Sequence, residues 1–171
     1  STELIIATSG VVIAACAFGL SIYQAWLSAK ATRLSVRPHL QLATFSSGQD
    51  YDFKVVLENN GLGPAFIESF TVFLDNEVIE GDEPLLWAIN KIHLPEHRTE
   101  AMNIKEGSAI KDGQSNCLLN LKFHQPNNKP FVPKIYIDKI TERVTLTIHY
   151  TDGFGRKMKS VVSENKLEGI N

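Results

Sequence analysis

Two histidines four residues apart, His93 and His97, are the pair in this sequence that comes closest to a metal site. Histidines at positions i and i+4 of a helix can bind one zinc ion, as in the pattern H-E-x-x-H. Here Pro95 lies between them and disfavours the continuous helix that such a site needs. We therefore expect two exposed loop histidines and no metal site.

The serine and cysteine residues also lack the setting of a nucleophile. A catalytic serine or cysteine is presented on a sharp turn beside a base, and neither "GPAFIESF" nor "EGSAI" has that form. Cys117 lies in an alternating apolar run, where a buried core residue is the expected role. The glycines of "GLG" and "GFG" suit turns rather than a phosphate-binding loop. We expect no enzyme, no catalytic residue and no cofactor.

Other side chains are better candidates for contact with a partner or an anion. Trp87 lies in an apolar stretch, where it either closes one end of the core or acts as a binding hot spot. A basic cluster near the C-terminal end either binds an anionic partner or protects a strand from edge-to-edge aggregation. The candidate contacts are Trp87, Arg156, Lys157 and Lys159.

Composition predicts one folded domain with a short appendage. The chain has 171 residues, with 17 Lys and Arg against 19 Asp and Glu and a net charge of −2. This balance lacks the positive excess that binds a nucleic-acid polymer. Cys16 and Cys117 lie in unlike surroundings, so we expect no disulfide and a reducing compartment.

The segment from Leu4 to Leu27 contains no charged residue. As a helix with a rise of about 1.5 Å per residue, it would be about 36 Å long and could cross a hydrocarbon core of about 30 Å. Aromatic rings near its end suit the headgroup level, and basic residues follow directly. We expect a transmembrane helix at 4–27 in contact with the lipid bilayer. Its predicted interface residues are Tyr23, Trp26, Lys30, Arg33 and Arg37.

The charges around this segment predict its orientation. Glu3 alone precedes it and basic residues follow, so the positive-inside rule places the N-terminus outside and the C-terminal domain in the cytoplasm. The expected location is the bacterial inner membrane, crossed once. Two alternatives stay open: a helix buried in a soluble protein, and a secretory signal cleaved near Ala29-Lys30-Ala31. The acidic start and the length of the apolar run argue against the signal.

Small residues recur along one side of the apolar segment at alternating spacings of three and four. Such a stripe lets two helix backbones approach closely in lipid. It predicts a helix–helix interface and a possible homo-oligomer, although small residues are also common in any membrane helix. The candidate interface residues are Ala7, Gly10, Ala14, Ala17 and Ser21.

After Pro38 the pattern changes from helical to alternating. The segments "HLQLATF", "FKVVLEN", "AFIESFTVFLD" and "RVTLTIHY" predict strands. Turn residues predict a hairpin at 75–77, and "TDGFG" predicts a final hairpin that returns along "RKMKSVV". "EPLLWAINKI" predicts a short helix, and "FVPKIYIDKITE" a short helix or an irregular crossover.

Short strands at spacings near ten residues predict an all-β fold, an antiparallel β-sandwich with one or two short helices. We expect this domain at 37–164. The other predicted segments are a short N-terminal tail at 1–3, a basic juxtamembrane linker at 28–36, a loop at 124–130 and a C-terminal tail at 165–171.

The stretch "VVLENNGLGPAFIESFTVFLDN" resembles the second and third strands of immunoglobulin-like domains of the adhesion and cell-surface type. The full layout resembles a class of uncharacterised bacterial single-pass membrane proteins. These have an "RPxL" strand start, here Arg37, Pro38 and Leu40, and a late "Y-x-D-x-x-G-+" hairpin. In this chain the hairpin residues are Tyr150, Asp152, Gly155 and Arg156. The resemblance implies an immunoglobulin-like sandwich and a membrane anchor, and it implies no activity.

Together these features predict a membrane-anchored, non-enzymatic interaction or sensor module whose sandwich binds a protein or a small ligand. One alternative is a membrane-perturbing effector that senses a signal, for example a nucleotide messenger in phage defence. Another alternative is a periplasmic domain that acts in envelope assembly.

Overall fold

The computed structural model of the chain describes residues 2–47, 51–124 and 133–163. The chain divides into two compact units, Ser1–Arg37 and Pro38–Asn171. The predicted tail at 165–171 and the predicted loop after His124 lie outside the described residues.

The first unit contains one helix, α1, which covers Thr2–Ser35 and has no buried residue. Over its most apolar 18 residues the mean hydropathy is 2.2. It is the one helix in the described part of the chain that is long and apolar enough to cross a membrane, a property that a signal sequence near an N-terminus shares. The helix continues through 28–35, where the sequence predicted a linker, because "SAKATRLS" contains no helix breaker before Pro38.

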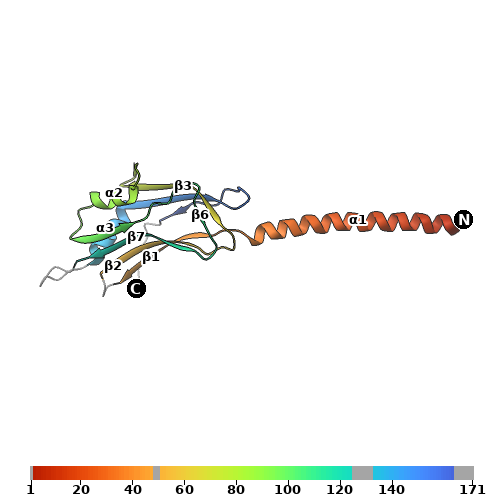
Figure 1. The fold of residues 1–171 in the computed structure, drawn as a ribbon, viewed down its shortest axis with the longest axis horizontal. Helices are drawn as coiled ribbons and strands as arrows, with labels where there is room; N and C mark the ends of the chain where they lie inside the picture. The colour runs from red at the N-terminus through yellow and green to blue at the C-terminus, as the bar shows by residue number, and fades with distance from the viewer. Residues whose placement is uncertain (1, 48–50, 125–132, 164–171) are drawn as a thin grey trace. The chain divides into compact units, whose positions relative to one another are not determined.

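One sheet of the second unit has four antiparallel strands in the order β1-β2-β7-β5 (Figure 1). They are β1 (Leu40–Ser47), β2 (Asp52–Asn59), β7 (Ser115–Phe123) and β5 (His97–Ala101). Along β2 every second side chain is buried, beginning at Phe53. The strands predicted at "HLQLATF" and "FKVVLEN" are confirmed, because alternation places one face of each strand against the core.

The other sheet has the order β4-β3-β8-β9, and β6 also pairs with β3. Its strands are β3 (Ala65–Leu74), β4 (Glu77–Ile79), β6 (Ala109–Ile110), β8 (Val144–Thr151) and β9 (Val161–Val162). Asp75 and Asn76 join β3 to β4 with φ of +52° and +68°. A two-residue turn with both φ values positive suits a hairpin, so the predicted turn at 75–77 is confirmed.

The final hairpin is more broken than predicted. Thr151 faces Lys157 in an isolated bridge, whereas Ile148 faces Val161 in the β8–β9 pairing. The returning segment therefore contains one extra residue between these two points, which interrupts the ladder as a β-bulge does. The prediction of one continuous return strand is wrong because an alternating pattern carries no mark of such an insertion.

Two short helices complete the second unit, α2 (Pro84–Lys91) and α3 (Pro133–Arg143). Each begins with proline, whose fixed φ suits the first turn and whose missing N–H is not needed there. The short helix predicted at "EPLLWAINKI" is confirmed. Of the two alternatives for "FVPKIYIDKITE", the structure has the helix.

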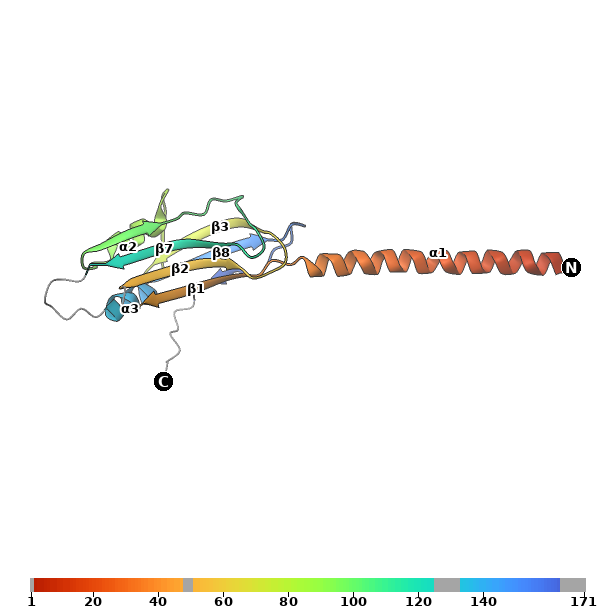
Figure 2. The same cartoon turned by 60° about the horizontal axis from the view of Figure 1, so that its bottom comes forward.

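The two sheets enclose one hydrophobic core, seen as two layers in Figures 1 and 2. Side chains from both sheets meet there, among them Leu57 and Leu121 from one sheet and Ile67 and Ile148 from the other. Antiparallel sheets packed on one core form a β-sandwich.

Asn59 is fully buried at the end of β2 and joins several loops. Its Oδ1 accepts hydrogen bonds from the backbone N–H groups of His39 and Gly61, both at 3.1 Å. Its Nδ2 donates to the carbonyls of Gly63 at 2.8 Å, Ile110 at 3.1 Å and Lys111 at 3.2 Å. One buried side chain thus supplies hydrogen bonds to three separate backbone segments.

Candidate interaction surfaces

Strand β1 lies at the margin of its sheet (Figure 2). Among the described residues it pairs with β2 on one side and with no strand on the other. It is eight residues long, "LQLATFSS", and contains no charged residue and no proline. Edge strands that avoid pairing with other chains are usually short, charged or interrupted. β1 has none of these protections.

The hydrogen bonds around β1 show which of its backbone groups face outward from the sheet. The carbonyl of His39 accepts from the N–H of Asn60, so residue 39 bonds toward β2. The N–H of Leu40 points away from β2, because it donates to the Tyr150 hydroxyl at 3.4 Å. Since these directions alternate along an antiparallel strand, the N–H and carbonyl of Thr44 also point away from β2.

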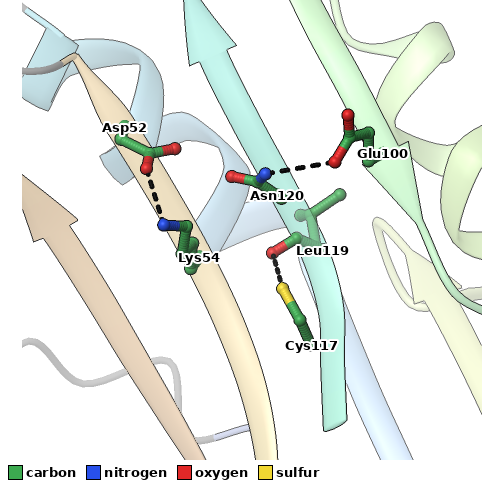
Figure 3. Close-up of polar contacts among 6 residues, drawn as sticks. All are labelled: Asp52, Lys54, Glu100, Cys117, Leu119 and Asn120. Atoms are coloured by element: carbon green, nitrogen blue, oxygen red, sulfur yellow. Dashed lines mark hydrogen bonds and ion pairs between the residues drawn. The ribbon is translucent and has the colours of Figure 1, made fainter.

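The outward face of the β1-β2-β7-β5 sheet carries a ladder of polar side chains (Figure 3). Lys54 Nζ lies 2.9 Å from a carboxylate oxygen of Asp52. Asn120 stands opposite Lys54 on β7 and donates to Glu100 of β5 at 3.3 Å. Arg98 of β5 contacts Glu100 at 3.0 Å. Charges of both signs alternate, so this face has no strong preference for one sign of ligand.

Two buried oxygen atoms in this ladder, Asp52 Oδ1 and Asn120 Oδ1, have no hydrogen-bond partner among the residues that the structure describes. They are acceptors at the surface of the sheet, where ordered water can satisfy them. In the part of the chain that the structure describes, no three His, Cys, Asp or Glu side chains gather to hold a metal ion.

Cys117 is exposed on this face, contrary to the prediction of a core residue. Val55 pairs with Leu119 and Val56 with Cys117, so Leu118 is an extra residue in β7. Both Leu118 and Leu119 are buried, and the insertion turns Cys117 to the outside. Its thiol contacts the Leu119 carbonyl at 3.4 Å (Figure 3).

Residues 4–167 of the chain match the model of a domain of unknown function, DUF8453. The chain belongs to the DUF8453 family. The match extends over both units, so α1 and the sandwich are parts of one family pattern. No curated protein matches the chain.

The predicted helix–helix stripe of this DUF8453 chain lies on α1, where its five residues are exposed. No atom outside the helix lies within 4 Å of a Cβ built at Gly10. The Ser21 hydroxyl donates to the Ala17 carbonyl at 2.9 Å, a bond within the helix. The stripe residues are therefore exposed on α1, and self-association through them stays a prediction.

The predicted interface residues lie toward the C-terminal part of α1. The rings of Tyr23 and Trp26 are 6.3 Å apart, and Lys30 Nζ lies 5.1 Å from the centre of the Trp26 ring. A cation over an indole ring is a favourable contact, so the Lys30 and Trp26 side chains lie together. Arg33 lies in the last turn of α1, and Arg37 follows the helix.

Trp87 projects from α2 and is 60% exposed, so its predicted role as a core plug is wrong. Leu85, Ala88 and Ile89 fill that place instead, because they lie on the buried side of the helix. Lys91 Nζ lies 5.5 Å from the centre of the Trp87 ring. The indole is available for contact with a partner, which stays a prediction.

The basic cluster is spread along the segment after β8. Arg156 ends a turn in which its N–H donates to Asp152 Oδ1 at 2.9 Å. Lys157 faces Thr151, and Lys159 follows in the segment before β9. All three side chains are exposed.

The two histidines considered for a metal lie in different settings. His93 is exposed after α2. His97 begins β5, and its Nδ1 lies 2.6 Å from the Pro95 carbonyl. His97 is half-buried in this strand, so the prediction of an exposed loop residue is wrong for His97.

Where β3 ends and β8 begins, Arg143 forms an ion pair with Asp75, and the Arg143 Nε–H donates to Asp75 Oδ1 at 2.8 Å. This hydrogen bond lowers the pKa of the Asp75 carboxyl below its usual value. Because the folded state prefers the charged carboxylate, the pair stabilises the fold above about pH 4, and this contribution is lost as the pH falls through the lowered pKa. Asp75→Asn should therefore lower the thermal unfolding midpoint slightly at neutral pH and not at all in strong acid.

Thermal unfolding of both proteins between neutral pH and strong acid checks this expectation. Glu77→Gln, in the same hairpin, is the control and should show the pH dependence of the parent protein. If the unfolding midpoint of Asp75→Asn stays below that of the parent by the same amount in strong acid, the role of the ion pair is contradicted.

Proposed function

We propose that this DUF8453 chain is a membrane-anchored, non-enzymatic module whose sandwich binds an extended segment of a partner protein along β1. The observation that carries the proposal is the β1 edge, eight residues without a charge. An extended peptide that adds to such an edge gains main-chain hydrogen bonds, and the alternate side chains give specificity.

The other sheet margins support the choice of β1. β5 is five residues long and carries Arg98 and Glu100, and β4 and β9 have only three and two residues. Short or charged edges discourage strand addition. β6, beside β3, also has only two residues. Among the described strands, β1 thus differs from the other marginal strands in its length and its lack of charge.

The anchor is proposed from α1, which is apolar over Leu4 to Leu27 and has no buried residue. The basic residues Lys30, Arg33 and Arg37 follow this stretch. The positive-inside rule favours a cytoplasmic sandwich at the inner membrane, crossed once by α1.

The strand order supports an immunoglobulin-like fold. The order β1-β2-β7-β5 corresponds to strands A, B, E and D of that fold, and β3-β8-β9 corresponds to C, F and G. β4 would then be an additional strand beside C. Immunoglobulin-like sandwiches serve many binding roles, so this likeness favours a binding module without naming its partner.

Thr44→Pro tests the β1 edge. Proline removes the N–H that faces outward and leaves the bonds to β2 in place. We expect roughly ten times less of a partner protein to purify in mild detergent with this full-length variant than with the parent chain. This loss corresponds to a binding free energy weakened by about 1.4 kcal/mol. The amount of each copurified protein, measured by quantitative mass spectrometry, gives the result.

Thr44→Val is the matched control, because it changes the same side chain and keeps the N–H. It should retain the partner, and both variants should unfold at nearly the parent temperature. Equal recovery with Thr44→Pro and Thr44→Val would rule out strand addition at β1.

A further inference from the structure

Three loops of the second unit lie together at one end of the sandwich. The Asn59 side chain donates to Gly63 in loop 60–64 and to Lys111 in loop 111–114, at 2.8 and 3.2 Å. A Cβ built at Gly153, in loop 152–157, would lie 3.8 Å from the ring of Phe66 at the start of β3. We refer to loops 60–64, 111–114 and 152–157 as the proximal end.

The chain arrives from α1 at this end. The N–H of Asn60 donates to the carbonyl of His39 at 2.8 Å. His39 is four residues after Ser35, the last residue of α1, and four residues span at most about 14 Å. Chain length alone therefore allows loop 60–64 to reach the surface of a bilayer that holds α1.

The proximal end exposes large apolar side chains on an ordered backbone. Leu62 is 75% exposed and Phe154 is 52% exposed. Asp152, only 2% exposed, accepts hydrogen bonds from the N–H groups of Phe154 and Arg156, both at 2.9 Å. The turn that presents Phe154 is thus held by a buried carboxylate, which fixes the position of this exposed ring.

Charge differs between the two ends of the sandwich. At the proximal end Lys111, Arg156 and Lys157 are exposed and basic, against one exposed acid, Asp112. At the other end of β3, residues 75–83 contain five acidic residues and no basic residue, and one of the five, Asp75, pairs with Arg143. An anionic lipid surface attracts Lys and Arg and repels carboxylates, so it favours contact at the proximal end.

We propose that the proximal end rests on an anionic bilayer surface, with Leu62 and Phe154 among the headgroups and Lys111 and Arg156 beside anionic lipids. Leu and Phe enter the boundary between headgroups and acyl chains readily, and nearby basic side chains strengthen the contact. The inference rests on the proposed membrane anchor, since α1 must bring the sandwich to the bilayer.

The test uses the full chain in nanodiscs of equal parts phosphatidylcholine and phosphatidylglycerol that contain a lipid with a nitroxide at its headgroup. Paramagnetic loss of the amide signals is measured for Leu62, Phe154 and Val78. Val78 is the matched control because it is also 52% exposed but lies on β4, away from the proximal end. We expect at least about threefold greater signal loss at Leu62 and Phe154 than at Val78.

The double variant Lys111→Glu with Arg156→Glu should reduce this loss in the anionic nanodiscs, as should nanodiscs of phosphatidylcholine alone. The proposal would be overturned if Leu62, Phe154 and Val78 lost equal amide signal. If the signals near the ends of the apolar part of α1 were strongly reduced in the same sample, the membrane anchor would stand. Absence of signal loss in α1 as well would overturn the anchor and this inference together. Equal broadening in neutral and anionic nanodiscs would overturn the role of the basic residues.

Discussion

Replacing Asn59 by alanine is expected to lower the free energy of unfolding of the sandwich by about 3 kcal/mol or more. The side chain makes five hydrogen bonds to backbone groups and is fully buried. Alanine would remove the partner of buried carbonyls at Gly63 and Ile110 and of part-buried N–H groups at His39 and Gly61, and a buried group left unpaired costs about 1–3 kcal/mol. A loss of this size should lower the thermal midpoint by about 10 °C or more.

Two variants separate the buried hydrogen bonds from a general effect of the loop. Asn60→Ala removes an exposed side chain whose contact with Gln41 is 3.3 Å long, and it should cost no more than about 0.5 kcal/mol. Asn59→Asp keeps the shape of the side chain but replaces the donor Nδ2 by an oxygen. This oxygen cannot donate to the three carbonyls that Nδ2 contacts. This variant should destabilise at least as much as alanine. If Asn59→Asp unfolds at the parent temperature, the donor role of Asn59 is wrong.

Ile13→Asp is expected to make membrane insertion of α1 less favourable by about 3 kcal/mol. Ile13 is exposed near the middle of the uncharged segment, where a carboxylate would meet the hydrocarbon core. The fraction of the full-length chain that stays in the membrane pellet after alkaline extraction should fall clearly below that of the parent.

Ala31→Asp adds the same charge to the same helix, beyond the apolar part of α1. It should remain in the membrane pellet, because its carboxylate would lie at or beyond the headgroups. Equal extraction of Ile13→Asp and the parent would contradict a transmembrane position for 4–27. Processing of the chain near Ala29 in cells would instead favour the secretory signal.

Local patterns in the sequence predict many elements of the structure. The long uncharged stretch predicts α1 as an apolar helix, alternation predicts β1 and β8, and apolar runs bounded by turn residues predict β2 and β3. The turn at Asp75 and Asn76 follows from the preference of these residues for positive φ. Each of these predictions depends on interactions within a few residues of the chain.

The candidate surfaces depend on contacts between distant segments. The sequence predicted Cys117 in the core, but one inserted residue, Leu118, reverses the side chain, and no local pattern marks the insertion. Trp87 lies among apolar residues in the sequence, as a core residue does. Only the packing of α2 shows that its neighbours Leu85 and Ala88 are buried while Trp87 is exposed. The stripe on α1, by contrast, was visible from spacing alone.

The sequence by itself thus determined an apolar helix followed by an antiparallel β domain, because helix and strand periodicity are properties of neighbouring residues. Only the tertiary structure decided that β1 lies at the margin of its sheet among the described residues, since strand order depends on which distant segments pair. It also decided that Asn59 joins residues up to 52 positions away, and that Leu62 and Phe154 share one end of the sandwich with Lys111 and Arg156. These relations arise from the burial of one common core, which brings together segments that the sequence keeps apart.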